Sequence, residues 1–576
     1  MFEIGWGSAE IDVSPKGYAM NGYGMSNHQA HETRTPLLAR ALVISDGSTR
    51  RVVLCCLDMA MVTHEMREEA CRSLAGLMGE QFWSEGFALM CTHTHSSPGG
   101  CGHEAMYNFV TPGFVQEHLD AVVDAITAAV GTAIASVAPS ELSLATGRFG
   151  ERDEVAWNRS IAAYNRNPDA PTMSASQAHV ALDRDMAVLS VSRDHELRAM
   201  MSLFGVHATC IGNTLRAHDG DNKGYAAQDA EREMDSRSGH DDAVAIFAQA
   251  TAGDVSPHYH GPGQVRRRRA VRKGGDAIYA EQNGKLQSRR ALTVADHEVQ
   301  VPIDGPLDAV LAYFDFTNVE VDPIHVDGVK GARTSDPCHG ASFFEGTRID
   351  GLGIPKPAGS VARFLARRIR QRRLSRHDGL SRQDRGYYQE LYASQGAKDI
   401  VLEAGRKLTL GRPLAKTMLP DFVDPAVAEM KREARSGSLE HSPMVATILP
   451  VQIIRIGSLV LLCCPGEFTT TAGRRLRESV AGMLASDGIE KVLIATYCND
   501  YMGYVTTVEE YQEQAYEGGH TIFGQWTLGA FQTRFAEMAE QLTLNRDKRT
   551  YDTSIRPPRV PPAELALRSS LAPRGK

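Results

Sequence analysis

Residues 51–95 read RVVLCCLDMAMVTHEMREEACRSLAGLMGEQFWSEGFALMCTHTH, and this stretch indicates the fold class. It begins with an apolar run at 51–57, continues through a helix-like segment at 63–79, and ends in a second apolar run at 87–91 that stops at THTH. Short runs of β-branched and aliphatic residues that end abruptly in polar sequence are typical of buried strands. Buried strands that alternate with helices predict an α/β protein.

Apolar runs of this kind recur along the chain. There are six of them, at 51–57, 87–91, 200–206, 243–247, 459–464 and 492–495. A further helix-like stretch spans 116–135. We therefore expect one large domain with a mixed or mostly parallel β-sheet core and helices around it. Ligands of such sheets bind beyond the carboxyl ends of the strands, so the polar residues that follow the runs are expected to meet there.

The composition is that of a globular protein. The chain has 576 residues, of which 42% are hydrophobic and 23% are charged, and its formal net charge is −8. These values exclude a disordered or fibrous chain, and they provide no overall positive field for nucleic acid.

The sequence shows no targeting signal, no membrane-spanning segment and no CxxC pair. The amino terminus lacks the basic start and apolar run of a signal peptide, and no uncharged apolar run reaches the roughly 18 to 20 residues of a transmembrane segment. The ten cysteines form no CxxC pair. A reducing, cytoplasmic location without a disulfide framework is therefore expected.

Two basic segments are expected to be excursions from this core, at about 258–300 and 355–440. The run of four arginines at 266–269 has no interleaved aromatic residues, so it is a poor platform for nucleic acid. Residues 361–374 (VARFLARRIRQRRL) predict a basic amphipathic helix. Its apolar residues near helical spacing are Val361, Leu365, Ile369 and Leu374. The helix is either docked on the surface with a solvated face or in contact with an anionic membrane or acidic partner.

Histidines and a carboxylate follow several of the apolar runs. If the strand at 87–91 continues, His93 and His95 project to the same face, which suits a metal ion or an anionic intermediate. The alternative is a pair of hydrogen-bonded loop histidines. His207 and Glu467 stand in the same place after other runs, and imidazoles with a carboxylate are the ligand types of a catalytic zinc site. Glu467 also suits the first turn of a helix, and both roles are compatible.

Hydroxyl groups provide further candidates. Ser256 lies in a turn of small residues, AGDVSP at 252–257, where a serine most often caps or closes the turn. An aromatic segment beyond the sixth run contains Tyr501, Tyr504, Tyr511 and Tyr516. These tyrosines are either core residues with hydrogen-bonded hydroxyl groups or donors to a ligand or oxyanion.

Several blocks of the sequence, taken together, resemble the neutral (non-lysosomal) ceramidase family. They occur in the order of that family between about residues 4 and 535: GYGMSNHQAHETRTPLLARAL, THTHSSPGG, WNRS, GVHATC, GDNKGYA, GDVSP, SFFEGTRIDGLG, PGEFTTTAGRRLRESV and GYVTTVEEYQEQAYEGGHTIFGQWTL. The resemblance implies a zinc amidase that hydrolyses the N-acyl bond of ceramide to a fatty acid and a sphingoid base.

The resemblance also implies roles for individual residues. One Zn²⁺ per chain would be held at the positions that match the family's ligands, which are His93, His207, Glu467 and Tyr504. The residue that matches the family's nucleophile in GDVSP is Ser256. Contacts to the substrate and the oxyanion would come from His95, from Arg159 of WNRS and from Tyr516.

The expected organisation is a large single catalytic domain at 1–543 with the zinc site at the carboxyl ends of strands. Residues 544–576 are expected to be an arm containing Pro and Arg, without the immunoglobulin-like domain that family members commonly carry. The expected substrate is ceramide or a related N-acyl lipid. Two alternatives stay open: an amidase or esterase for a soluble N-acyl amine or ester, and a non-catalytic protein that binds an anionic surface through the basic helix. Nothing in the sequence sets an oligomeric state.

Overall fold

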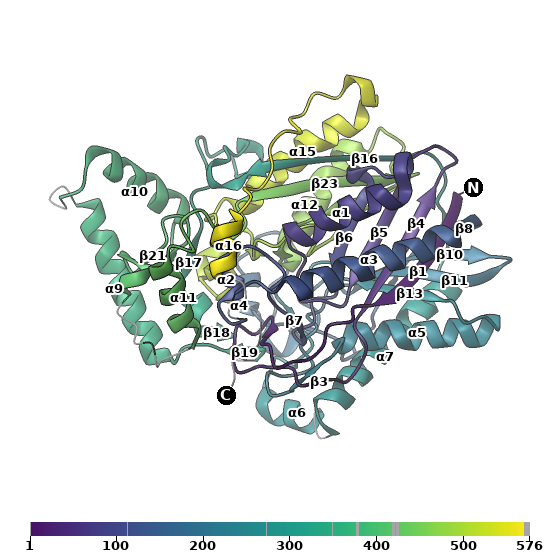
Figure 1. The fold of residues 1–576 in the computed structure, drawn as a ribbon, viewed down its shortest axis with the longest axis horizontal. Helices are drawn as coiled ribbons and strands as arrows, with labels where there is room; N and C mark the ends of the chain where they lie inside the picture. Colours follow the sequence, from purple (N-terminus) through teal and green to yellow (C-terminus); the bar gives the residue numbers. More distant parts are fainter. Residues whose placement is uncertain are drawn as a thin grey trace.

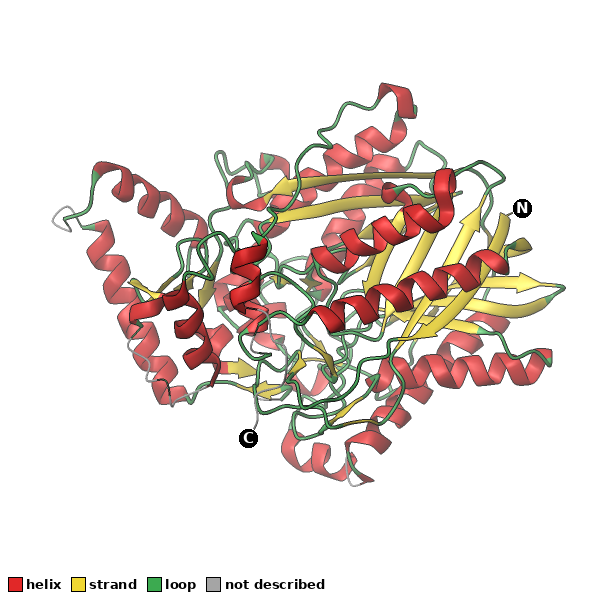
Figure 2. Cartoon of the chain, viewed as in Figure 1, coloured by secondary structure: helices red, strands yellow, loops and turns green. Residues whose placement is uncertain are grey.

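The core of the chain consists of two β-sheets that pack face to face, with helices on both outer sides (Figure 1, Figure 2). The structure is a computed structural model, and it describes residues 2–568 apart from 112, 272–273, 348, 376–378, 418–420 and 422–424. Side chains from both sheets, among them Trp6, Leu54, Ile454 and Leu461, share one buried cluster between the sheets.

The larger sheet has the strand order β13-β11-β10-β8-β1-β4-β5-β6, with β15 also paired to β8. Its strands are β1 (Phe2–Glu10), β4 (Leu38–Ser45), β5 (Arg51–Leu57), β6 (Phe87–Cys91), β8 (Ala138–Arg148), β10 (Asp185–Arg193), β11 (Glu196–Leu203), β13 (Val244–Ala248) and β15 (Val301–Pro302). The smaller sheet has the order β16-β23-β24-β26. Its strands are β16 (Leu307–Asp315), β23 (Ile448–Ile456), β24 (Leu459–Cys463) and β26 (Lys491–Ala495).

The six predicted strands are confirmed, and they form the three parallel pairs of these sheets. The pairs are β5 with β6, β11 with β13 and β24 with β26. A helix connects the two strands of each pair: α1 (His64–Met78), α5 (Asp221–Ser238) and α12 (Thr470–Leu484). The remaining pairs described in the two sheets are antiparallel. The core is therefore mixed, which is one of the two forms predicted.

Helices cover the outer faces of both sheets. On the larger sheet, α1 and α3 (Gln116–Ala135) cover one part, while α5 and α7 (Asp276–His297) cover the other. On the smaller sheet, α12 and α15 (Thr527–Thr543) form the outer layer. Although α7 lies within the segment expected to be an excursion, its Ala291 and Leu292 belong to the core.

Helix α3, the second predicted helix, has the expected bounds. By length and composition it is the one described helix that could cross a membrane, but half of the relevant window is buried in the protein. It packs closely on β1, because a Cβ atom added at Gly5 would lie 1.8 Å from the carbonyl oxygen of Ala133. Such close packing is typical of a core helix, and core helices of globular proteins can be as long and as apolar as a membrane-spanning helix.

A lobe built from residues within 338–436 lies at the left in Figure 1. Its sheet consists of β17 (Cys338–Gly340), β20 (Ile400–Glu403), β21 (Leu408–Thr409) and β22 (Arg412–Pro413). Its helices are α8 (Ala341–Glu345), α9 (Lys356–Leu374), α10 (Arg382–Gln395) and α11 (Pro425–Ser436). A hairpin of β18 (Gly346–Thr347) and β19 (Gly351–Leu352) connects α8 to α9.

The predicted basic helix is α9, and it docks on the lobe, but three of the four apolar residues singled out in the sequence stay exposed. Val361, Leu365 and Leu374 are 59%, 40% and 42% exposed, whereas Ala366 is buried. Three arginines make ion pairs with the lobe instead: Arg363 with Glu345, Arg367 with Asp399 and Arg373 with Glu403. The helix is therefore docked, as one of the two readings predicted, but ion pairs with carboxylates of the lobe contribute to the docking in place of Val361, Leu365 and Leu374.

The predicted carboxyl-terminal arm folds back onto the rest of the chain. Its helix α16 (Pro562–Arg568) is tied down by Glu564, which accepts hydrogen bonds from the amide groups of His441 and Ser442. The last residues of the arm, 569–576, lie outside the described residues, as do 272–273, 376–378, 418–420 and 422–424 within the predicted excursions. All ten cysteines are free thiols.

Candidate metal centre and active site

Two short strand pairs bring the candidate residues together beyond the ends of both sheets. In the first pair, β25 (Glu467–Phe468) runs parallel to β27 (Tyr504–Val505), with Glu467 opposite Tyr504. In the second, β14 (Val255–Ser256) runs antiparallel to β9 (Trp157–Asn158). The amide group of Arg159 then donates a hydrogen bond to the carbonyl oxygen of Asp254 at 2.8 Å, which holds Arg159 near Ser256.

Other short elements frame this region. They are β2 (Met20–Asn21), β3 (Glu32–Thr33), β7 (Ser97–Pro98), β12 (Ala217–His218), α2 (Ala105–Asn108), α4 (Ile161–Tyr164), α6 (Gln264–Val271), α13 (Val508–Glu513) and α14 (Tyr516–Gly519).

Three of the four predicted metal ligands form one buried cluster. One ligand atom from each of His93, His207 and Glu467 lies within 4.8 Å of the others. The Nε2 atom of His207 is 3.0 Å from Oε2 of Glu467, and the Nε2 atom of His93 is 3.6 Å from Oε1. This cluster could hold a metal ion.

Hydrogen bonds behind the cluster fix the orientation of its ligand atoms. The Nδ1 atoms of His93 and His207 contact the carbonyl oxygens of Ala60 and Val255, at 2.5 Å and 2.9 Å. A proton on each Nδ1 leaves Nε2 free to offer its electron pair, which is the arrangement that supports metal ligation by histidine.

Two tyrosines support the carboxylate of the cluster. The hydroxyl group of Tyr497 donates to Oε2 of Glu467 at 2.9 Å, and that of Tyr501 donates to Oε1 at 2.5 Å. The sequence indicated hydroxyl groups near this segment but did not assign Tyr501 or Tyr497 to Glu467.

The pKa shifts of Glu467 and His93 favour the protonation states in which these groups bind a metal ion. Burial by itself would raise the pKa of Glu467, but His93 and His207 hold that pKa well below its ordinary range. Burial lowers the pKa of His93 to about 4. At neutral pH the carboxylate is therefore ionised and His93 is neutral, which are the protonation states that metal ligands require.

Tyr504, the fourth predicted ligand, and His95 lie beside the cluster. The hydroxyl group of Tyr504 is 3.2 Å from Nε2 of His207, and the Nε2 atoms of His95 and His93 are 3.1 Å apart. The strand does not continue through the two histidines, because β6 ends at Cys91 and His93 has a left-handed φ of 65°. A loop, rather than a strand, turns the two imidazoles toward each other.

Ser256 and Arg159 meet at a carboxylate that the sequence did not single out. The hydroxyl group of Ser256 donates to Oδ1 of Asp350 at 2.7 Å, and Nη1 of Arg159 donates to Oδ2 at 2.9 Å. Arg159 also donates to Glu517 at 2.8 Å and to the hydroxyl group of Tyr504 at 2.9 Å. The β18–β19 hairpin supplies Asp350 from the lobe, so no strand end marks it in the sequence.

The carboxyl group of Asp350 is also charged at neutral pH. Burial would raise the pKa of Asp350, but the guanidinium of Arg159 and the imidazole of His258 hold it well below its ordinary range. Asp350 is thus an ionised acceptor that orients the Ser256 hydroxyl group and Arg159 at once.

Tyr516 lines the same wall of the site. Its ring lies 5.4 Å from the ring of Tyr504, and the guanidinium of Arg159 lies 5.6 Å from its centre. The ring of Phe343 in α8 stacks on the ring of Tyr516, with the ring centres 5.9 Å apart. Tyr511 does not contact this group, because its hydroxyl group donates a hydrogen bond to the buried carbonyl oxygen of Gln395. All eight predicted site residues therefore lie in one continuous group.

A family profile described as "Neutral/alkaline non-lysosomal ceramidase, N-terminal" matches residues 2–420 and 433–533. The chain belongs to the neutral ceramidase family. Neutral ceramidases are amidohydrolases that act on the N-acyl amide of ceramide, so the resemblance found in the sequence is confirmed at the level of the family.

Relatives in this family cover nearly the whole chain. The neutral ceramidase of Mycobacterium tuberculosis is 32% identical over 97% of this chain and 79% of its own length. The neutral ceramidase of Pseudomonas aeruginosa is 30% identical over 96% of this chain and 73% of its own length.

Solved structures agree with the sequence relatives. A structure described as "Ceramidase complexed with C2" superposes with a TM-score of 0.77 at 29% identity, covering 97% of this chain and 77% of that one. The crystal structure of the neutral ceramidase from Pseudomonas aeruginosa gives a TM-score of 0.74 at 29% identity, covering 97% and 76%. The α/β fold is thus that of the neutral ceramidases.

Proposed function

We propose that the protein is a zinc-dependent amidohydrolase that cleaves the N-acyl amide bond of ceramide or a ceramide-like N-acyl lipid, giving a fatty acid and a sphingoid base. The observation that carries this proposal is the buried cluster of His93, His207 and Glu467 beside the pair of Ser256 and Arg159. Family membership supplies the substrate class, and the cluster supports the metal.

The residues present fit a zinc ion. Two imidazole nitrogens and a carboxylate oxygen form the donor set of many catalytic zinc sites, and Tyr504 is the proposed fourth ligand. The tyrosine hydroxyl groups that donate to Glu467 are the kind of outer contact that orients a ligating carboxylate. When bound, zinc supplies a Lewis acid that polarises a carbonyl group and lowers the pKa of water.

The protein's own donors would stabilise the developing oxyanion. Arg159 is held between Asp350 and Glu517, so its position needs no reorganisation during the reaction. Burial, together with the neighbouring His93, lowers the pKa of His95 well below its ordinary value, so His95 is neutral and can donate one N–H. With Tyr516 as a third donor, each correctly aimed donor contributes about 2.7 to 4 kcal/mol to the transition state.

Two alternative roles are open to Ser256, and kinetics can distinguish between them. In the first, its oxygen bonds to the amide carbon, the amine leaves with a proton, and water then releases the fatty acid from an acyl-enzyme. In the second, the hydroxyl group only orients the attacking water. A burst of amine before the steady state supports the first role, and its absence supports the second.

The test of the proposed function uses the purified, zinc-loaded protein. We expect release of fatty acid from a long-chain ceramide presented in detergent, and slower release from a short-chain soluble N-acyl amine. Faster cleavage of the soluble compound would favour the alternative substrate class. Release from neither compound would contradict the proposal.

We also propose that α9 is the element that contacts membranes during lipid hydrolysis. Val361 and Phe364 are 59% and 58% exposed on its outer side, close to Arg368, whose guanidinium lies over the ring of Phe364. Exposed apolar residues flanked by arginines suit an anionic interface. The cytoplasmic location stays a prediction.

A further inference from the structure

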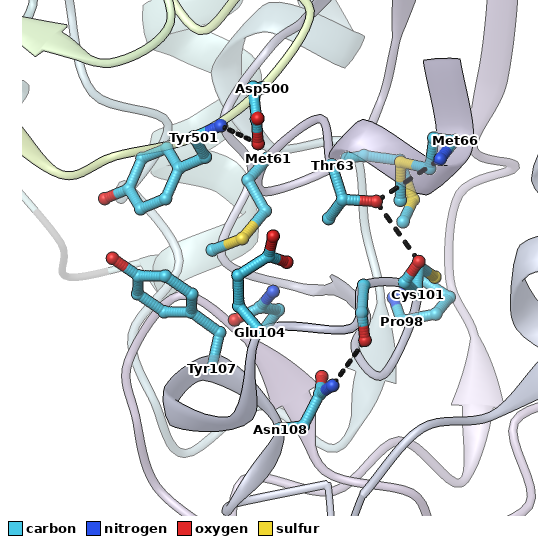
Figure 3. A pocket seen from close by; sticks show the side chains of 13 residues that line it. Met61, Thr63, Met66, Pro98, Cys101, Glu104, Tyr107, Asn108, Asp500 and Tyr501 are labelled. Atoms are coloured by element: carbon cyan, nitrogen blue, oxygen red, sulfur yellow. Dashed lines mark hydrogen bonds between the residues drawn. The ribbon is translucent and has the colours of Figure 1, made fainter. Parts of the chain in front are cut away.

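Two parts of the chain support the active site from outside the metal cluster. Tyr501, which donates to Glu467, lies in the core. Its ring lies edge-on to that of Tyr107 of α2, with the ring centres 5.3 Å apart, on the wall of a small pocket (Figure 3). Asp350, which accepts a hydrogen bond from Ser256, comes instead from the β18–β19 hairpin of the lobe. Its position therefore depends on contacts within the lobe.

The base of this hairpin is bonded to the last residues of α8. The amide group of Gly353 donates to the carbonyl oxygen of Glu345 at 3.0 Å. One residue further, the amide group of Ile354 donates to the carbonyl oxygen of Phe344 at 2.7 Å. Since β18 follows Glu345 directly in the chain, both ends of the hairpin are fixed at this residue.

Thr347 connects the base of the hairpin to its tip. Its hydroxyl oxygen accepts the amide of Asp350 at 3.0 Å and the amide of Gly351 at 3.3 Å. Beyond the tip, the side chain of Asp350 is 6% exposed and bonds to Ser256 and Arg159. A shift at the base of the hairpin therefore displaces this carboxylate.

An arginine of the basic helix holds the base of the hairpin in place. Nη1 and Nη2 of Arg363 in α9 donate to Oε1 and Oε2 of Glu345, at 2.5 Å and 2.6 Å. The two side chains are 32% and 20% exposed, so the pair is largely shielded from solvent. Two parallel hydrogen bonds fix the direction of a carboxylate as well as its position. The pair thus joins α9 to the residue from which the hairpin starts.

A glycine of α9 leaves the room for this pair. A Cβ atom added at Gly359 would lie 1.8 Å from Oε1 of Glu345, so the carboxylate would have to move. Glycine is a poorer helix former than alanine. The presence of a buried glycine near the start of α9 is explained by the close approach of this carboxylate.

We propose that Arg363 and Glu345 are positioning residues of the active site, whose ion pair holds the β18–β19 hairpin so that Asp350 reaches Ser256 and Arg159. Both act through Asp350 rather than on the substrate. The proposal rests on the proposed hydrolase function and deepens it, because it gives the basic helix a role in turnover that is separate from membrane contact.

Kinetics of the zinc-loaded protein on a soluble short-chain N-acyl amine test this proposal without interference from membrane binding. Gly359→Ala displaces the Glu345 carboxylate, and a misplacement of about 1 Å can cost roughly 100-fold in rate. We therefore expect kcat to fall about 10-fold while KM changes by less than about 2-fold. The unfolding midpoint should stay within about 2 °C of that of the wild type, since alanine favours the helix.

Gly386→Ala, near the start of α10, is the matched control for Gly359→Ala. Among the described residues, a Cβ atom added at Gly386 meets nothing within 4 Å beyond its own stretch of helix. This variant should keep the kcat of the wild type.

Removal of charge provides an independent set of variants. Glu345→Gln and Arg363→Gln should each lower kcat, and the double variant should be no slower than the slower single variant, because both changes break one pair. In the Asp350→Asn background, neither change should lower kcat further, whereas a merely structural role would give additive losses. Asp399→Asn, which breaks the ion pair of Arg367 elsewhere on α9, should keep the kcat of the wild type.

Amide hydrogen exchange gives a readout that does not require turnover. The amides of residues 350–354 should exchange faster in Gly359→Ala and in Glu345→Gln than in the wild type, and at the wild-type rate in Gly386→Ala. Unchanged exchange in both variants, or wild-type kcat in either variant of an active enzyme, overturns the proposal. If the wild type releases no fatty acid, the proposed function is contradicted instead, and hydrogen exchange alone decides whether the ion pair holds the hairpin.

Discussion

Replacing Asp350 with asparagine tests whether one buried carboxylate organises both Ser256 and Arg159. The change preserves shape but removes the charge that accepts hydrogen bonds from the serine hydroxyl group at 2.7 Å and the guanidinium at 2.9 Å. A hydrogen bond to a charged group contributes about 1.5 to 3 kcal/mol. If the transition state loses one such bond, kcat falls about 10-fold to 150-fold, since 1.36 kcal/mol corresponds to a factor of ten.

The same substitution has a smaller effect on folding. Arg159 keeps its second partner, Glu517 at 2.8 Å, so the free energy of unfolding should fall by about 1 to 3 kcal/mol rather than the 3 to 5 kcal/mol of a fully broken buried pair. The pH profile of kcat should keep its shape, because the depressed pKa of Asp350 leaves that residue ionised across the neutral range.

Steady-state kinetics on an N-acyl substrate, together with zinc analysis, provide the assay. Asp350→Asn should lower kcat and retain one zinc per chain, because Asp350 makes no hydrogen bond to the three cluster residues. Asp399→Asn is the matched control, since Asp399 also pairs with an arginine, Arg367, but on the surface of the lobe. Wild-type kcat in Asp350→Asn, or a loss that follows loss of zinc, would refute the reasoning.

Three further predictions concern the metal, the surface and the histidines. Tyr501→Phe removes the hydroxyl group that lies 2.5 Å from Glu467, and should lower zinc affinity about 10-fold to 100-fold in a chelator competition; unchanged affinity would argue against this contact. Phe364→Asp should reduce sedimentation with anionic vesicles while leaving turnover of a soluble substrate unchanged, and equal sedimentation would exclude α9 as the membrane contact. Burial lowers the pKa values of His28 and His218 to about 4, so the unfolded state binds more protons between pH 4 and 6.5. Stability should therefore fall as pH drops through this range, and equal urea midpoints at pH 7 and pH 5 would contradict that.

The sequence was sufficient to predict the strands of the parallel pairs, because each is a continuous apolar run that ends abruptly. It did not predict that these strands divide between two packed sheets. The antiparallel strands that complete the sheets, such as β1 and β23, are paired by contacts far apart in the chain. Local patterns carry no information about such partners, so the number of sheets came only from the structure.

In the candidate site, too, some residues could be predicted from the sequence and others could not. His93, His207 and Glu467 could be predicted because each follows an apolar run. Asp350 could not, since a hairpin of the separate lobe delivers it to Ser256. The ion pairs that dock α9 could not be predicted for a similar reason, because amphipathic spacing does not show which carboxylates the lobe will present.

Metal content measured together with amidase activity tests the central claim most directly, in the wild type, Glu467→Ala and Ser256→Ala. The wild type should hold one zinc per chain and be active. Glu467→Ala should lose zinc and activity together, while Ser256→Ala should keep zinc and lose activity. Full zinc and full activity in Glu467→Ala, or an active Ser256→Ala, would contradict the account.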